Sequence, residues 1–283
     1  MTQTVLLVEC PDRKGIVARV SDFIFRSDAN IISSDQHSTD PEGGRFFMRL
    51  VFSLDEFSVS RDAFERGFAP VAEELGATWE IHYLSDVQRM GILVSKQDHC
   101  LFDLLYRQRS GELSVEIPLV ISNHEDCREL VERYGIPYHC VPVAVERQAD
   151  AEGKMLELVK GTTDFLVLAR YMRILSNRFL EEYPGDIINI HHSFLPSFKG
   201  ANPYRQAYER GVKIIGATAH FVTGDLDEGP IIEQMVDHVY YKDTVDDLKR
   251  KGRNLEKLAL ANAIHAYLEH RVIRYEKKTI VFP

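Results

Sequence analysis

From residue 90 onward, short runs of consecutive apolar residues alternate with segments of helical periodicity. The apolar runs are Met90–Val94, Val115–Ser122, Phe165–Ala169 and Ile187–Ile190, and a long amphipathic helix is expected at about Thr244–His270. Strands that are apolar on both faces are typical of a parallel sheet that is covered by helices on both sides. The pattern predicts a Rossmann-like, mostly parallel α/β sheet, in which ligands bind beyond the carboxyl ends of the strands.

The first 84 residues show a different pattern, in which apolar strands alternate with two helical stripes. Strands are expected at residues 4–8, 30–32, 46–52 and 78–83, and helices at residues 16–24 and 63–75. The order β-α-β-β-α-β is the ferredoxin-like arrangement. We therefore predict a separate domain over residues 1–84, a polar linker at residues 85–89 and a second domain over residues 90–283.

The charge balance and the cysteines narrow the classes of partner. Lys and Arg number 34 and Asp and Glu number 43, which gives a formal net charge of −9. A chain this acidic is a poor general binder of nucleic acid, because phosphate neutralisation needs a basic face. No apolar run reaches the roughly 18 residues of a membrane span, and the first residues lack the pattern of a signal peptide. The four cysteines show no CxxC spacing, so we expect free thiols in a cytoplasmic protein.

The densest polar segment, Asn189–Gly200, begins at the end of the last apolar run. On an extended backbone, Asn189 and His191 point to the same side of the strand, because side chains alternate with a period of two. An amide and an imidazole that converge on one point could bind a developing oxyanion. His192 should point the other way, so His191 and His192 are not expected to bind one metal ion together. Taken alone, the segment is explained more simply by two histidines that are hydrogen-bonded at a strand end.

A second polar cluster, Ala219–Pro230, lies between two apolar strands. Three carboxylates, those of Asp225, Asp227 and Glu228, are bracketed there by glycines. A hydrophilic turn is one interpretation, because Asp and Gly are common in turns. The other is that one carboxylate faces the imidazole and acts as a general base. Taken alone, this cluster is better explained as a turn.

Together, these segments resemble the signatures of the formyltransferases and hydrolases that use 10-formyltetrahydrofolate. The matching stretches are Asn189–His191 with Leu195–Gly200, His220–Thr223 with Leu226–Pro230, and the loop Ala169–Ser176. The resemblance covers about residues 88–283 and implies that Asn189, His191 and Asp227 form the catalytic trio. It also implies a folate pocket that is lined by Met172, Arg173, Ile174, Leu175, Lys199, His220, Thr223 and Gly224. Arg173 and Lys199 are the candidates for binding the carboxylates of the folate tail.

The segment Glu9–Val17, together with Ala29–Ile31, resembles an ACT domain. ACT domains are ferredoxin-like modules that often bind small amino acids and pair edge to edge. The resemblance implies allosteric regulation in a homo-oligomer, with an amino-acid effector bound by Asp12, Arg13, Lys14, Gly15 and Asn30. The turn before the first helix suits the effector's carboxylate, because the N–H groups at a helix N-terminus attract anions. A purely structural dimerisation module is the alternative.

An ACT-like domain ahead of a formylfolate-using domain is the arrangement of the formyltetrahydrofolate deformylases. The acceptor loop supports this resemblance. Glycinamide ribonucleotide formyltransferases follow the first strand of the sheet with a Gly-Ser-Asn loop that binds a phosphate. This chain has Ser95–Cys100 there, with no glycine and with the anionic Asp98. Backbone N–H groups cannot close on a phosphate in such a loop, although Lys96 and His99 could form an unrelated anion site.

The resemblance therefore implies hydrolysis of 10-formyltetrahydrofolate to tetrahydrofolate and formate. This reaction supplies formate for purine synthesis and balances the one-carbon folate pool. Water would attack the formyl carbon, Asn189 and His191 would bind the oxyanion, and Asp227 would orient or deprotonate the water and favour the cationic form of His191. His192 stands where the transferases often carry proline, and it could help to exclude an amine acceptor.

Two alternatives to hydrolysis remain open. One is formyl transfer to an amine acceptor, and the other is a non-catalytic amino-acid sensor. The intact Asn189, His191 and Asp227 argue against the sensor. No prosthetic cofactor is expected, and no catalytic metal, because the histidines lack HxxxH spacing.

Overall fold

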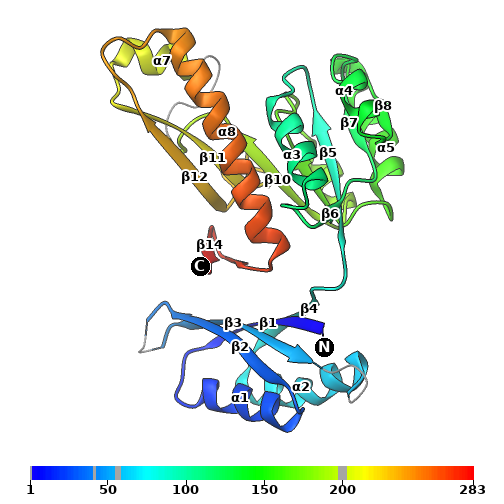
Figure 1. Cartoon of the computed structure of the whole chain (residues 1–283), viewed down its shortest axis with the longest axis vertical. Coiled ribbons are helices and arrows are strands. Elements are labelled where there is room, and N and C mark those ends of the chain that lie inside the picture. The colour runs from blue at the N-terminus through cyan, green and yellow to red at the C-terminus, as the bar shows by residue number, and fades with distance from the viewer. Residues whose placement is uncertain (1, 41–42, 55–58, 197–202) are drawn as a thin grey trace. The chain divides into compact units, whose positions relative to one another are not determined.

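The computed structural model describes residues 2–40, 43–54, 59–196 and 203–283, which group into two units (Figure 1). The elements of the first unit are β1 (Thr2–Pro11), α1 (Ile16–Arg26), β2 (Asn30–Ser38), β3 (Arg45–Leu54), α2 (Arg61–Leu75) and β4 (Thr78–Tyr83). Its four-stranded antiparallel sheet has the order β2-β3-β1-β4. The predicted ferredoxin-like fold is confirmed.

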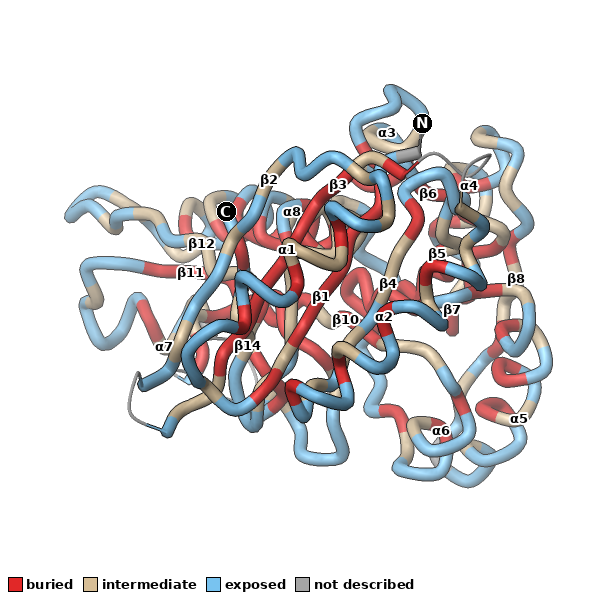
Figure 2. The backbone as a smooth tube through the Cα atoms, turned by 90° about the horizontal axis from the view of Figure 1, so that it is seen from below, coloured by how far each residue is buried: buried red, intermediate tan, exposed pale blue. Residues whose placement is uncertain are grey.

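The two faces of this sheet follow from the alternation of side chains along β1. Leu6 and Val8 face α1 and α2 and pack into the main core, whereas Val5 and Leu7 lie on the opposite face. Figure 2 shows the buried stretch along β1 as a red segment of the tube. Helix α1 begins after Gly15, whose φ of 94° suits a residue without a Cβ.

The C-terminal residues complete the second face of the same sheet. Ile273 packs against Val5, Leu7 and Val51, and Arg49 donates hydrogen bonds to the backbone carbonyls of Glu269 and His270. Residues 269–273 and 280–283 therefore group with residues 1–87, which differs from the expected continuous range 90–283. The expected linker also overlaps a strand, because Gln88 and Arg89 pair with β6.

The second unit contains the remaining elements of the chain. They are β5 (Gln88–Val94), α3 (His99–Arg109), β6 (Val115–Glu116), β7 (Val120–Ser122), α4 (Arg128–Arg133), β8 (Tyr138–Cys140), a 3₁₀ turn (Val145–Arg147), α5 (Gln148–Val159), β9 (Phe165–Leu168), α6 (Asn177–Glu182), β10 (Asp186–His191), α7 (Pro203–Arg210), β11 (Ile214–Phe221), β12 (Ile231–His238) and α8 (Val245–Leu268). The chain ends in a two-stranded sheet of β13 (Val272–Tyr275) and β14 (Lys278–Val281).

The main sheet of this unit has the order β12-β11-β10-β9-β5-β7-β8, with β6 paired to β5. Strands β10, β9, β5, β7 and β8 run parallel, and β11 and β12 are antiparallel to their neighbours. The predicted mostly parallel sheet is confirmed. Helices α5 and α6 contribute Met155, Val159 and Phe179 to the core on one face, and α8 packs against β11 and β12 (Figure 1).

One predicted strand is divided in the structure. The apolar run Val115–Ser122 forms the two short strands β6 and β7. Pro118 lies between them, and proline has no N–H to donate to a strand ladder. Among the helices of the described ranges, none is both long and apolar enough to cross a membrane.

Candidate functional site

The polar residues collect where the parallel strands β5, β9 and β10 end. Ser95 and Arg170 follow β5 and β9, and His191 is the last residue of β10. Because parallel strands end at one edge of a sheet, the three residues lie at the same edge. The antiparallel strand β11 then brings a second histidine to this edge, since His220 pairs with Asn189 in the register of β10 and β11. The sheet topology thus assembles side chains that are far apart in the sequence.

The three predicted catalytic side chains meet around His220. The Nδ1 atom of His191 lies 3.2 Å from Oδ1 of Asp227, and Nδ2 of Asn189 lies 3.2 Å from Nε2 of His220. The same His220 nitrogen lies 3.8 Å from Oδ1 of Asp227. Asn189 and His191 therefore share one side of β10, as the alternation of side chains predicted.

The turn that carries Asp227 is held by its glycine and by backbone hydrogen bonds. The N–H of Phe221 donates to the carbonyl of Pro230 across the turn, at 2.9 Å. A Cβ at Gly229 would lie 1.8 Å from the carbonyl oxygen of Phe221, so no other residue fits there without moving the backbone. Asp227 itself has a φ of 56°, in the left-handed region that Asp tolerates better than most residues.

The hydrogen bonds of His220 define its tautomer. Its Nδ1 lies 2.8 Å from the carbonyl oxygen of Phe221, which only accepts, so Nδ1 carries the hydrogen. Burial lowers the pKa of His220 and keeps the ring neutral, so Nε2 accepts a hydrogen bond from the Asn189 amide. The amide nitrogen of Asn189 has two hydrogens, and this contact uses one of them.

The carboxylate of Asp227 provides a negative charge beside His191 and His220. Its burial alone would raise the pKa of its carboxyl, but the hydrogen bond from His191 and the nearby imidazoles outweigh burial and lower that pKa. The carboxylate therefore accepts from Nδ1 of His191. The opposite ring nitrogen of His191, Nε2, is buried and has no hydrogen-bond partner among the described residues. A buried imidazole nitrogen without a partner is suited to bind a group of the substrate.

The predicted folate loop after β9 presents apolar side chains at the surface. Met172 and Ile174 are 57% and 64% exposed, Leu175 is buried, and Arg173 is exposed. The loop is held at both ends, because Met172 donates its N–H to Oγ of Ser95 and Gln148 donates to the carbonyl of Ile174. Exposed apolar side chains on a tethered loop are suited to contact a flat aromatic ligand.

The other predicted folate residues divide into three cases. Thr223 and Gly224 lie in the exposed turn that leads to Asp227, where the Thr223 hydroxyl donates to the carbonyl of Asp225. His220 is buried, and its ring contacts the predicted catalytic residues Asn189 and Asp227. Lys199 lies outside the described residues.

The predicted effector residues are not all at one place in the first unit. Asp12 accepts a hydrogen bond from Ser38, and Arg13, Lys14 and Gly15 follow it in the turn before α1. Asn30 begins β2 and pairs with Ser53, at the other end of the strand from Ser38. The expectation that Asn30 contacts the same ligand as Asp12 is therefore wrong within one chain, because the nine residues of β2 separate them.

A buried polar cluster lies next to the predicted catalytic residues, and the sequence analysis did not identify it. Its centre is Glu256 on α8, whose side chain is 1% exposed. Oε2 of Glu256 accepts from Nε2 of His99 at 2.7 Å, and Oε1 accepts from the Tyr204 hydroxyl at 2.7 Å. The guanidinium Nε of Arg170 lies 3.4 Å from Oε2. One signal was present in the sequence, because Glu256 interrupts the apolar stripe of α8 between Leu255 and Ala259.

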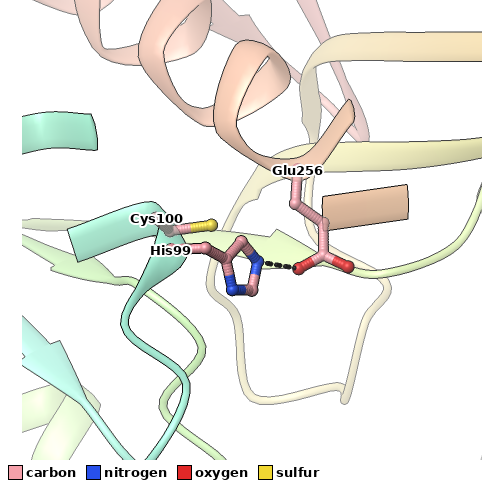
Figure 3. A group of neighbouring side chains, drawn as sticks. All are labelled: His99, Cys100 and Glu256. Carbon is pink, nitrogen blue, oxygen red and sulfur yellow. Dashed lines mark hydrogen bonds and ion pairs between the residues drawn. The ribbon is translucent and has the colours of Figure 1, made fainter. Parts of the chain in front are cut away.

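Figure 3 shows His99 and Cys100 at the start of α3 and Glu256 on α8. Their possible metal-ligand atoms all lie within 4.8 Å of one another. The donor set does not suit a divalent cation. Burial would raise the pKa of Glu256, but the hydrogen bond from His99 and the charge of Arg170 lower it, so the carboxylate is already neutralised. Burial also raises the pKa of the Cys100 thiol, and a protonated thiol is a poor ligand.

Comparison with known proteins agrees with this arrangement of domains. Residues 88–264 match the formyl transferase family, and residues 4–65 match the ACT domain. The chain is 51% identical over 278 residues to a formyltetrahydrofolate deformylase of Synechocystis sp., covering 98% of this chain and 97% of the relative. It is 52% identical over 278 residues to a formyltetrahydrofolate deformylase of Bacillus subtilis, covering 98% of this chain and 93% of the relative.

Solved structures give the same result for the fold. The crystal structure of a formyltetrahydrofolate deformylase from Pseudomonas syringae pv. tomato superposes with a TM-score of 0.95 at 45% identity, covering 100% of this chain and 95% of that chain. A glycinamide ribonucleotide transformylase from Symbiobacterium toebii superposes with a TM-score of 0.66 at 32% identity, covering 71% of this chain and 97% of that chain.

Proposed function

The chain belongs to the formyltetrahydrofolate deformylases, and we propose that it hydrolyses 10-formyltetrahydrofolate through Asn189, His191 and Asp227. The observation that carries the assignment of these residues is the pair of His191 and Asp227, 3.2 Å apart, beside the amide of Asn189. The reaction takes up water and releases tetrahydrofolate and formate, with no prosthetic cofactor.

The hydrogen-bond donors of the site suit the tetrahedral intermediate of this reaction. Water attacks the formyl carbon, and the carbonyl oxygen becomes an oxyanion. The second hydrogen of the Asn189 amide and a proton on Nε2 of His191 stabilise it: the contact with His220 uses one of the two amide hydrogens, and Nε2 of His191 has no partner among the described residues. Asp227 supports the protonated form of His191 by accepting from Nδ1.

The proton balance involves the same residues. The attacking water loses a proton, and the folate nitrogen gains one when its bond to the formyl carbon breaks. Asp227 is ionised, because its pKa is lowered, and its carboxylate lies 3.2 Å from the His191 imidazole. We assign to Asp227 the role of orienting or deprotonating the water, with His191 or a water molecule passing a proton to the folate nitrogen.

The folate is placed by two loops at this edge of the sheet. Met172 and Ile174 offer apolar surface to the pterin ring, and Thr223 and Gly224 lie in the same turn as Asp227. Arg173, which is exposed, is assigned to a carboxylate of the folate tail. Lys199 keeps the same assigned role from its place in the motif.

The first unit is assigned a regulatory role in a cytoplasmic homo-oligomer. Its turn Asp12–Gly15 precedes the 11-residue helix α1 and offers backbone N–H groups to the carboxylate of an amino acid. Arg13 and Lys14 add positive charge to this turn. Domain boundaries near residue 87 are supported by the grouping of residues 1–87 and by the start of β5 at Gln88.

The test is to measure formate release from 10-formyltetrahydrofolate when no acceptor other than water is present. We expect turnover that is proportional to enzyme concentration, with equal amounts of tetrahydrofolate and formate. Formate that appears only after an amine is added, or formylated amine in its place, would instead indicate a formyltransferase.

A further inference from the structure

A continuous series of side chains links the catalytic strand to the buried Glu256. The rings of His191 and His192 have centroids 5.1 Å apart, and those of His192 and Tyr204 are 6.3 Å apart. The Tyr204 hydroxyl then donates to Oε1 of Glu256 at 2.7 Å. The series therefore runs from β10 through α7 to α8, and every member except His191 is outside the predicted catalytic trio.

The far end of this series is held by residues of two other segments. His99, at the start of α3, donates to Oε2 of Glu256 at 2.7 Å, and Arg170, after β9, lies 3.4 Å from the same oxygen. The exposed fractions of the Glu256 and Arg170 side chains are 1% and 8%. A buried ion pair stabilises a fold little compared with apolar residues of the same size. We therefore interpret this pair as a device that fixes the positions of the side chains around Glu256.

Tyr204 is held in place by shape as well as by its hydrogen bond. A Cβ at Gly252 would lie 2.0 Å from the Tyr204 hydroxyl oxygen and 2.2 Å from the carbon that bears it. The ring of Tyr204 therefore occupies the space that a side chain at position 252 would need, one turn before Glu256 on α8. A glycine inside a helix costs about 1 kcal/mol relative to alanine, and here it admits the tyrosine.

His192 is an uncharged group at its place beside His191. Burial, together with the charges of Arg170 and His191, lowers its pKa to about 4, so the ring is neutral near pH 7. A neutral ring with such a low pKa is a weak base and a poor candidate to deprotonate water. Its effect on the reaction is therefore expected to come from the space that it fills.

We propose that His192, held by Tyr204 and Glu256, closes the space beside His191 to amine acceptors, so that water is the nucleophile that reaches the formyl carbon. The inference rests on the proposed function of the site. The loop after β5 takes part in the same cluster, because Gln97 accepts from Nε of Arg170 and His99 donates to Glu256. Ser95 of the same loop accepts from the N–H of Met172, so this loop connects the cluster around Glu256 to the predicted folate loop.

The test measures how the formyl group divides between water and an added amine. Three variants act at successive points of the series: His192→Ala removes the ring, Tyr204→Phe removes the hydroxyl, and Glu256→Gln removes the charge. Tyr208→Phe is the matched control, because Tyr208 lies on the same helix and is 50% exposed. Each protein receives 10-formyltetrahydrofolate with an excess of glycinamide, and mass spectrometry measures both formate and formylglycinamide.

We expect formate alone from the unchanged chain and from Tyr208→Phe. The ratio of formylglycinamide to formate should rise by about tenfold or more in all three variants: His192→Ala empties the space that the ring fills, and Tyr204→Phe and Glu256→Gln lose a hydrogen bond to a buried charge. The ratio does not depend on how much of a variant is folded, so a loss of yield in Glu256→Gln does not change the interpretation.

Two results would overturn the inference while leaving the proposed function intact. One is continued formate release in all three variants with no formylglycinamide above the level of the control. The other is loss of both products in His192→Ala with normal folate binding, which would mean that His192 acts on the water itself. Absence of formate from the unchanged chain without amine is a separate result, and it would overturn the proposed function together with this inference.

Discussion

Replacing Asp227 with asparagine tests the central ion pair of the site. The change keeps the shape of the side chain but removes its charge, 3.2 Å from Nδ1 of His191. Both side chains are largely buried, with exposed fractions of 16% for Asp227 and 8% for His191, so solvent screens the pair weakly. At an effective dielectric constant of about 20, two unit charges about 4 Å apart interact by about 4 kcal/mol.

This energy sets the size of the expected effect. If the transition state needs a cationic His191, the loss of a few kcal/mol lowers kcat by a factor on the order of 10²–10³, since about 1.4 kcal/mol corresponds to tenfold. The KM for 10-formyltetrahydrofolate should change little, because the predicted folate contacts are on other residues. The assay is the steady-state rate of formate release, with a folate-binding measurement alongside.

The pH dependence provides a second measurement on the same variant. The pKa of Asp227 is lowered in the folded protein, so the charge is present above the ordinary carboxyl pKa and is lost as the pH falls through the lowered one. The unchanged chain should therefore lose activity and the stability from this pair at acid pH, and Asp227→Asn should lack this acid limb. Asp225→Asn is the matched control, because Asp225 lies in the same turn but is exposed. A kcat for Asp227→Asn within tenfold of the control would refute the reasoning.

Three further predictions concern the turn, the metal requirement and the first unit. Gly229→Ala should lower the melting temperature and kcat, because overpacking lowers the free energy of unfolding by about 1–3 kcal/mol. Gly153→Ala is the control and should change neither, because no atom lies within 4 Å of a Cβ at that position. Equal melting temperatures for the two variants would contradict the close approach of Gly229 to Phe221. Prolonged chelation should leave formate release unchanged, because Glu256 is already neutralised by His99 and Arg170; activity that zinc or iron restores would disprove this. Calorimetric titration of the full chain with glycine and methionine should show binding that Arg13→Ala and Lys14→Ala weaken; heats that are identical in the variants would exclude this turn as the effector site.

Periodicity along the chain was enough to predict both folds. The alternation of Val5 and Leu7 with Leu6 and Val8 depends only on the geometry of a strand, and the structure places the two pairs on opposite faces of the first sheet. The strands around Leu93 and Leu166 are continuously apolar because both faces of their sheet are buried, and this pattern is visible in the sequence. Pro118 was visible in the sequence as well, although its effect on the strand was not predicted.

The positions of the residues that we propose as catalytic were partly predictable, because two of them lie in one short, local pattern. Asn189 and His191 are two residues apart on one strand, so strand geometry alone places them on one side. Asp227 lies in a recognisable glycine-rich turn, but its distance from His191 depends on the pairing of β10 with β11. The same pairing brings His220 to Asn189, and no local pattern distinguished that role from a folate contact.

The cluster around Glu256 was decided by the tertiary structure alone. His99, Arg170, Tyr204 and Glu256 come from four segments, and the first and last are 157 positions apart in the chain. A sequence specifies which side chains are apolar at each position of a helix or strand, because that choice follows from local geometry and burial. It does not specify which donor a buried carboxylate contacts when the two are far apart in the sequence. Those contacts form only after the strand order of the sheet and the packing of α3, α7 and α8 bring the segments together.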